Sequence, residues 1–196
     1  MITRGFHRRR EPDERLPPGQ YLEHDFPVLS AGPTPQTPLE AWDFAITGAV
    51  DPERTWSWDE LQALPREEIT VDIHCVTTWS KLDTSWTGVS VDTLLDDVEL
   101  LGGYVTALCD GGYTTNLPVE DVTGGKAWIA YGYDGDELEP EHGGPARLLV
   151  PHLYLWKSAK WVRRLIFSED DEPGFWETLG YHDRGDPWLE QRYQGD

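Results

Sequence analysis

The sequence predicts a single α+β domain that is rich in β-strands and has short helices. Three observations support this prediction. The chain has 196 residues, enough for one well-buried domain, whereas two domains of half that length would each be marginal. Polar and apolar residues alternate in several short segments, and turn residues such as Asp-Gly separate some of these segments. No internal repeat interrupts this organisation.

The two ends of the chain differ in composition from its middle. Residues 1–38 are rich in Pro, Arg and Glu and show neither a helical nor a strand period, so we expect an extended N-terminal arm. Residues 39–171 carry the regular patterns and are expected to form the domain. Residues 172–196 place aromatic residues among Gly and Pro, and we expect an irregular, aromatic-rich tail that packs on the domain.

The first strand and both helices are expected from local patterns. "WDFAITGAV" (42–50) alternates as a strand does. "TWSWDELQAL" (55–64) predicts a helix, because Ser57 and Glu60 have the spacing of a capping box. "SVDTLLDDV" (90–98) predicts a second, shorter helix that begins near Ser90 or Asp92.

The remaining strands follow from alternation and turn residues. "EEITVDIHC" (67–75) predicts a strand that ends at Cys75. Asp110-Gly111-Gly112 is expected to join two strands of one hairpin, and Asp134-Gly135 two strands of another. Residues 146–170 are strand-rich, and Pro151 argues against a continuous helix there.

The chain is strongly acidic, with 36 acidic against 16 basic residues and a net charge of −20. Nucleic-acid binding depends on Lys and Arg that neutralise phosphates, so we expect no nucleic-acid partner. Such a surface has two explanations: ordinary solubility, or adaptation to high salt, which screens the repulsion between like charges.

No apolar run approaches the roughly 20 residues that span a bilayer, so we expect no membrane insertion. The basic residues near the N-terminus precede no apolar segment and do not resemble an export signal. We therefore expect a soluble, cytoplasmic protein.

Cys75, one of only two cysteines, has four possible roles on local grounds. A disulfide with Cys109 is disfavoured in a reducing cytoplasm, and a structural zinc site lacks its other ligands. His74 would lie on the opposite face of the strand and could not act as the base of a cysteine nucleophile, although His142 or His152 could approach through the fold. A plain buried thiol remains the simplest alternative.

Two longer segments favour another role for Cys75. "HCVTTWSKLDTSWTGVSVDTLL" (74–95) and "EHGGPARLLVPHLYLWKSAKWVRRLIF" (141–167) resemble the sulfite oxidase-like molybdopterin-dependent oxidoreductases of the stand-alone bacterial and archaeal type. The likeness covers roughly residues 40–168. It implies that family's molybdopterin-binding fold, with Cys75 on a strand end and a variable polar loop after it. It also implies a molybdenum–molybdopterin cofactor whose metal is bound by Cys75, and a soft thiolate suits that metal.

The resemblance also implies a set of cofactor-binding residues. The cofactor is anionic, so a protein of net charge −20 must gather positive charge locally, and residues 147–164 hold five of its basic side chains. Beyond the thiolate, the implied contacts are Cys109, Asp110, His142, Arg147, Ser158, Ala159 and Lys160. "FPVLSAGPTP" in the arm resembles a pterin-contacting loop, with Leu29-Ser30-Ala31 in place of its polar residues.

The family implies an enzyme that catalyses two-electron oxygen-atom transfer on a small substrate. Sulfite oxidases place arginines just after the ligand cysteine, whereas residues 76–81 contain none. We therefore expect reduction of an S-oxide rather than oxidation of sulfite, with Cys75, Trp79, Lys81 and Tyr113 at the reaction site. No CxxCH haem motif is present, so we expect a separate electron-transfer partner.

Three alternatives stay open at this point. Sulfite oxidation would use the same cofactor in the opposite direction. A non-catalytic binding module could keep the fold with a repurposed pocket. A metal-free thiol enzyme would use Cys75 as a nucleophile.

Overall fold

Two β-sheets form the framework of residues 14–196, the part of the chain that the computed structural model describes. The six-stranded sheet contains β1 (Tyr21–Leu22), β5 (Glu67–His74), β6 (Trp79–Ser90), β10 (Trp128–Tyr133), β11 (Asp136–Glu137) and β12 (Arg147–Leu149). The five-stranded sheet contains β2 (Asp43–Gly48), β4 (Arg54–Ser57), β8 (Tyr104–Cys109), β9 (Thr114–Pro118) and β13 (Val162–Ser168). A two-stranded ribbon pairs β3 (Val50–Asp51) with β7 (Glu99–Leu100).

Helices are few and short, as the sequence predicts. The α-helices are α1 (Trp58–Ala63) and α2 (Val91–Leu94). Short 3₁₀ turns occur at η1 (Leu39–Ala41), η2 (Asp110–Gly112), η3 (Val119–Asp121), η4 (Pro140–His142) and η5 (Glu177–Leu179). Within the described chain, no helix combines the length and the apolar character needed to cross a membrane.

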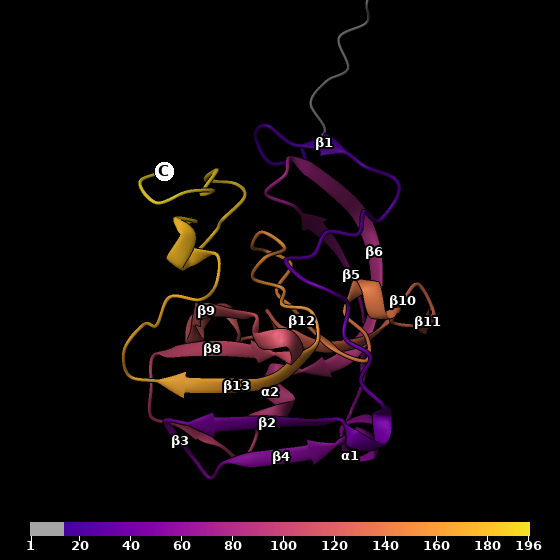
Figure 1. The fold of residues 1–196 in the computed structure, drawn as a ribbon, viewed down its shortest axis with the longest axis vertical. Coiled ribbons are helices and arrows are strands. Elements are labelled where there is room, and N and C mark those ends of the chain that lie inside the picture. Colours follow the sequence, from indigo (N-terminus) through magenta and orange to yellow (C-terminus); the bar gives the residue numbers. More distant parts are fainter. Residues whose placement is uncertain (1–13) are drawn as a thin grey trace, which may run out of the picture.

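The main hydrophobic core lies between the two sheets. It combines buried residues of the five-stranded sheet, such as Phe44 and Leu165, with residues of the other sheet, such as Val89 and Ile129. Figure 1 shows β2, β4, β8 and β13 side by side across the lower half, while β5 and β6 rise steeply at one side. A second, smaller cluster of buried side chains includes Cys75 and lies on the six-stranded sheet.

Local sequence signals explain several of these elements. Ser57 and Glu60 form both hydrogen bonds of the predicted capping box at the start of α1. Ser90 caps α2, and its hydroxyl accepts a hydrogen bond from the Asp92 amide. Strands β8 and β9 form an antiparallel hairpin through residues 110–112, and β10 and β11 form another. The predicted α+β, strand-rich fold is therefore confirmed.

The prediction of a polar loop after Cys75 is wrong. Only a four-residue turn separates β5 from β6, and β6 then runs for 12 residues from Trp79. The alternation was hidden because polar side chains are buried in this strand. Ser80 bonds to His74 with 2.8 Å between its Oγ and the imidazole Nδ1, and Thr84 donates to the carbonyl of Val71. Strand β5 also ends at His74, one residue earlier than expected.

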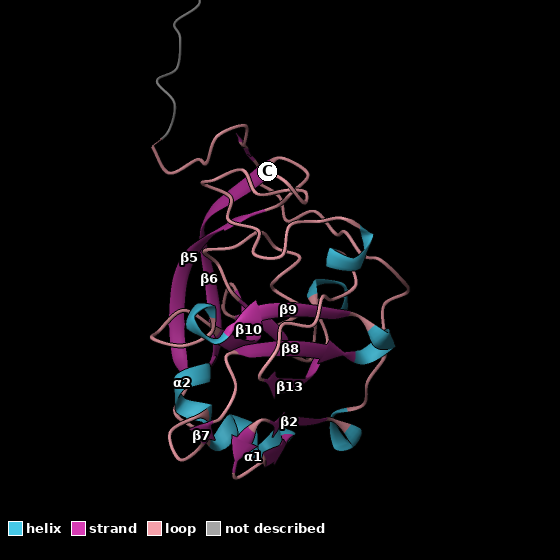
Figure 2. Cartoon of the chain, turned by 90° about the vertical axis from the view of Figure 1, so that its left-hand side faces the viewer, coloured by secondary structure: helices cyan, strands magenta, loops and turns pink. Residues whose placement is uncertain are grey.

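The two ends of the described chain meet on the same side of the sheets. Residues 14–38 of the predicted arm contain one short strand, β1, which pairs in parallel with the start of β6. Residues 1–13 of that arm lie outside the described residues. Figure 2 shows β5 and β6 curving toward the region that holds both the arm and the C-terminal end. This region contains the candidate site.

A fully buried ion pair fastens the C-terminal segment. Lys157 Nζ lies 2.5 Å from Glu177 Oε1, and neither side chain is exposed to solvent. Thr115 and Trp156 donate to the same carboxylate oxygen at 2.9 and 3.0 Å, and Lys157 also donates to the carbonyl of Asn116. These bonds connect the segment to β9 and to the loop between β12 and β13.

We expect the substitution Glu177→Gln to lower the free energy of unfolding by about 3–5 kcal/mol, because it leaves the buried Lys157 charge without its counter-ion. Unfolding in urea measures this change. The matched control is Asp97→Asn, which breaks the exposed Arg54–Asp97 pair and is expected to have little effect. A double variant, Lys157→Met with Glu177→Gln, should recover part of the loss. Wild-type stability in Glu177→Gln would contradict the anchoring role.

Candidate active site

A cavity of about 490 Å³ lies where the arm, the turn after β5 and the C-terminal segment converge. The arm contributes Phe26 and residues 29–33, and the turn contributes Cys75, Val76 and Thr77. Further lining residues come from η2, from the loop before β13 and from the C-terminal segment. This volume falls in the range typical of small-molecule sites.

Cys75 occupies the turn that joins β5 to β6. Its amide donates to the carbonyl of Trp79 at 2.8 Å, and the Thr78 amide donates back to its carbonyl at 3.0 Å, so the backbone of the turn is fixed. Its Sγ lies 3.1 Å from the hydroxyl of Thr77. Burial raises the pKa of this thiol, while hydrogen bonds from Thr77 and the backbone and the charge of Lys160 oppose that shift. A bound metal would favour the thiolate and so counteract the effect of burial.

Arg147, the first residue of β12, is the most deeply buried cation of the cavity wall. Its side chain is 2% exposed, and it donates to the carbonyls of His142 at 2.8 Å and Ser158 at 2.5 Å. Its guanidinium also lies 5.5 Å from the ring centre of Trp86. Burial lowers the pKa of Arg147 to about 10. Within residues 14–196, no carboxylate forms an ion pair with it.

Lys160 is the second cation of the cavity. Its ammonium donates to the carbonyl of Leu29 in the arm at 2.8 Å and to that of Glu141 at 2.6 Å. Burial, followed by the charge of Arg147, lowers the pKa of Lys160 to about 8. Lys160 therefore links the arm to the 140–147 segment and brings a second positive charge near Cys75.

Ser158 and Ala159 line the same wall, and the structure shows how they shape it. The Ser158 hydroxyl accepts a hydrogen bond from the Val150 amide at 2.9 Å, and the Ala159 carbonyl accepts one from the Leu148 amide at 2.9 Å. These bonds hold the loop after β12 against that strand. The Ser158 hydroxyl is thus already engaged with the protein backbone.

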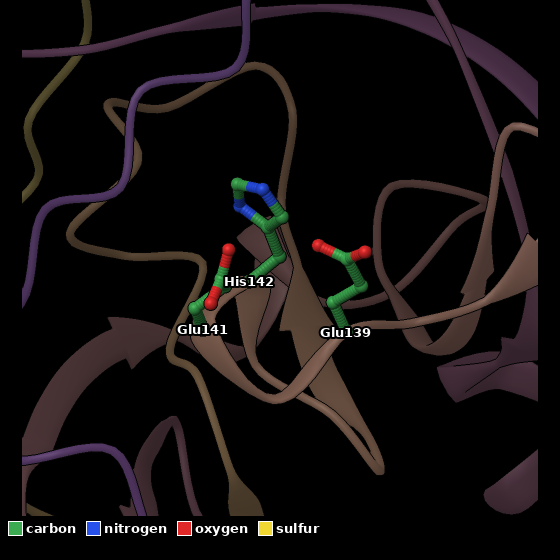
Figure 3. A group of neighbouring side chains, drawn as sticks. All are labelled: Glu139, Glu141 and His142. Carbon is green, nitrogen blue, oxygen red and sulfur yellow. The ribbon is translucent and has the colours of Figure 1, made fainter.

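His142 does not line the cavity itself. Its imidazole stacks on Phe26, with 4.1 Å between ring centres, and Phe26 forms part of the cavity wall. Burial, then the charges of Lys160 and Arg147, lower the pKa of His142. Figure 3 shows Glu139 and Glu141 beside this ring, with one possible ligand atom of each residue within 4.8 Å of the others. Both carboxylates are exposed, so the group is a surface cluster.

The other predicted site residues divide into two groups. Trp79, Asp110 and Tyr113 line the cavity, whereas Lys81 and Cys109 do not. Lys81 donates to the carbonyl of His24 in the arm, and Cys109 is buried in the main core. Asp110 is paired with Arg163 and accepts a hydrogen bond from Thr37 at 2.7 Å, so its carboxylate supports the structure of the wall.

Sequence reasoning missed most of one group of lining residues. Five aromatic side chains line the cavity, and they are called here the aromatic wall: Tyr113, Trp156, Phe175, Trp176 and Tyr181. Of these, only Tyr113 was predicted as a site residue. The abundance of aromatic residues after residue 172 was visible in the sequence, but it indicated only packing. Their position at the cavity depends on long-range contacts that have no local signature.

The residues present suit the anionic, sulfur-ligated cofactor that the sequence predicts. A buried guanidinium without a carboxylate partner is costly unless an anion compensates it. Arg147 Nε and Trp79 Nε1 are buried without a hydrogen-bond partner in the described chain, so two donors remain for a bound group. Cys75 offers a thiolate at the same cavity. The donor set therefore fits an anion that carries a metal.

Comparison with known proteins places this site in context. Residues 31–176 match the family described as the oxidoreductase molybdopterin binding domain. The chain is 43% identical to the uncharacterized oxidoreductase YuiH of Bacillus subtilis, over 97% of this chain and 99% of that protein.

A putative protein-methionine-sulfoxide reductase subunit, YedZ1 of Azospira oryzae, is 30% identical over 70% of this chain, which spans only 53% of that protein. Among solved structures, the sulfane dehydrogenase SoxCD of Paracoccus pantotrophus matches with a TM-score of 0.63 at 22% identity. This match covers 70% of the chain and 41% of the SoxCD chain, and it shows a shared fold.

We expect Gly143→Ala to lower the pterin content of the purified protein. Gly143 has φ +115°, and an added Cβ would lie 3.0 Å from the Cβ of Arg147 and 3.2 Å from the Cα of Lys160, so both cations must shift. Overpacking of this kind costs about 1–3 kcal/mol. Pterin per chain, released by denaturation and measured by fluorescence, checks the expectation.

Gly135→Ala is the matched control for this change. Gly135 also has positive φ, but nothing lies within 4 Å of an added Cβ, so the control carries the backbone strain alone. If Gly143→Ala retained as much pterin as Gly135→Ala, close packing at this position would not position the cofactor site.

Proposed function

The chain belongs to the oxidoreductase molybdopterin-binding domain family, and on this basis we propose that it is a molybdenum enzyme that reduces the S-oxide of a small molecule. The observation that supports this most strongly is the position of Cys75. Cys75 lines the same cavity as Arg147 and Lys160. A soft thiolate beside two cations suits a molybdenum centre held in an anionic pterin.

The charges of the cavity favour an S-oxide over sulfite. Sulfite is a dianion and needs cations that are free to bind it. Among the described lining residues, the cations are Arg147 and Lys160, and both already donate to backbone carbonyls. Those two charges also balance the cofactor in our proposal. The net charge of −20 opposes the approach of a dianion, whereas a neutral S-oxide is not repelled.

The proposed reaction breaks one S–O bond. The S-oxide accepts two electrons and two protons, and it leaves as a sulfide and one molecule of water. When bound, the molybdenum cofactor supplies the two-electron chemistry of this step. The two electrons come from a separate electron carrier, which we propose as the partner of this chain.

The residues of the chain bind the cofactor and substrate and restrict water. Cys75 would ligate the metal through Sγ, and Arg147 and Lys160 would hold the anionic pterin. Tyr113 donates its hydroxyl to the Trp156 carbonyl at 2.7 Å, and burial raises its pKa well above the ordinary value. Tyr113 therefore stays protonated and contributes an aromatic surface rather than a proton.

We expect the purified protein to carry about one molybdenum per chain, and Cys75→Ser to abolish turnover while leaving the fold intact. Steady-state assays with a reduced viologen dye as the electron donor should show turnover of sulfoxides. Assays with an oxidising dye should show little turnover of sulfite. Metal analysis of the wild type and of Cys75→Ser measures the molybdenum content, and circular dichroism of both checks that the fold is intact.

Cys109→Ser is the control, because Cys109 is a buried thiol of the main core. Efficient sulfite oxidation would reverse the proposed direction. A metal-free protein with no turnover would instead favour a binding module, and activity without molybdenum that disappears on alkylation of Cys75 would favour a thiol enzyme.

Cofactor uptake is expected to weaken as the pH rises through about 8. The pKa of Lys160 is about 8 in the folded protein, so its ammonium is charged below this pH and neutral above it. Loss of the charge removes one attraction for the anionic cofactor. Lys160→Arg keeps its charge, so its uptake should fall much less as the pH rises through about 8. Pterin binding by cofactor-free protein, measured from about pH 6 to about pH 10, tests this, and parallel curves for both proteins would refute it.

A further inference from the structure

We infer that the aromatic wall selects free small-molecule S-oxides that carry an aromatic substituent, an inference that rests on the proposed function. The wall residues are defined above as Tyr113, Trp156, Phe175, Trp176 and Tyr181. They line the same cavity as the two cations, Arg147 and Lys160. The cavity therefore offers a charged surface for the cofactor and an apolar surface for the group attached to sulfur.

The wall is a continuous series of ring contacts. The centre of the Tyr113 ring lies 5.9 Å from that of Phe175, which lies 5.1 Å from Trp176. Tyr181 then contacts both Trp176 at 4.9 Å and Trp156 at 5.3 Å. The hydrogen bond from Tyr113 to the Trp156 carbonyl closes the series. Such rings can receive another aromatic ring edge-on or in an offset stack.

The wall is held in place before any ligand binds. Glu177 lies between Trp176 and Tyr181 in the sequence, and its buried pair with Lys157 fixes this segment. The Phe175 amide also donates to the Thr114 carbonyl at 2.9 Å. A rigid wall loses little conformational entropy on binding, which favours affinity for a rigid ligand.

The wall stands close to the proposed reaction centre. Cys75, Lys160 and Tyr181 all line the same cavity. Part of the Phe175 surface, 39%, is exposed and is available to be covered by a ligand.

The size of the cavity argues against a protein-bound substrate. Its volume of about 490 Å³ must hold part of the cofactor as well as the substrate. The arm residues Phe26 and Leu29 line it together with the wall. The space that remains suits a small free molecule, such as an aryl methyl sulfoxide, better than a folded protein chain.

The test compares methyl phenyl sulfoxide with dimethyl sulfoxide, using the molybdenum-loaded full chain and a reduced viologen dye. We expect kcat/KM to be at least about tenfold higher for the aryl compound, because its ring buries apolar area and also gains aromatic contacts with the wall. Tyr181→Leu should reduce this preference about fivefold, mainly through KM. Phe175→Leu provides a second variant if Tyr181→Leu fails to fold.

The matched control is Tyr104→Leu, which should keep the wild-type preference. Tyr104 is the first residue of β8, and Cys109 is the last. Equal kcat/KM for both sulfoxides in the wild type, or a preference that survives in Tyr181→Leu and Phe175→Leu, would overturn the inference. Faster turnover of methionine sulfoxide within a peptide than of the aryl compound would also overturn it.

A binding measurement separates this inference from the proposed function. The dissociation constant of methyl phenyl sulfide is measured by ligand-observed NMR for the wild type and both variants. If no sulfoxide is reduced but the sulfide binds and is released by Tyr181→Leu, the wall remains an aromatic-ligand site and the proposed reaction is wrong. If no sulfoxide is reduced and the sulfide does not bind, both are wrong.

Discussion

The buried charge of Arg147 is the constraint on which the site depends. A guanidinium removed from water without a counter-ion costs several kcal/mol, and the described chain supplies only carbonyl oxygens and the face of Trp86 as partial compensation. Three segments converge on Arg147 to provide these contacts: η4, the loop that contains Ser158, and β6 through Trp86. An anionic ligand would remove the remaining cost, so the folded protein is preorganised for such a ligand.

Local charge and overall charge act in opposite directions in this molecule. Two cations, Arg147 and Lys160, lie at the cavity of a chain whose net charge is −20. At short range the cations dominate, because a poorly solvated site screens them weakly. At longer range the acidic surface repels anions, although salt weakens this repulsion. The short-range attraction suits a tightly held anionic cofactor. The long-range repulsion does not hinder a neutral substrate.

Sequence patterns predicted what depends on neighbouring residues. The capping box at Ser57 and the hairpin at residues 110–112 are local, and both formed as expected. The strand β6 was missed because Ser80 and Thr84 are buried through hydrogen bonds to partners elsewhere in the fold. The parallel pairing of β2 with β13 had no local signal, because the two strands lie far apart in the sequence.

The site shows the same division. Resemblance to the family pointed to Cys75 and to the basic segment, and eight of the eleven predicted residues line the cavity. Lys81 instead contacts the arm, and Cys109 packs in the core. The aromatic wall follows from the Lys157–Glu177 pair, which connects residues far apart in the sequence. Because Arg147 lies on β12 whereas Phe175, Trp176 and Tyr181 lie in the C-terminal segment, substitutions at these three wall positions should affect Arg147 little. The preference for a substrate can therefore diverge between relatives while the cofactor site remains the same.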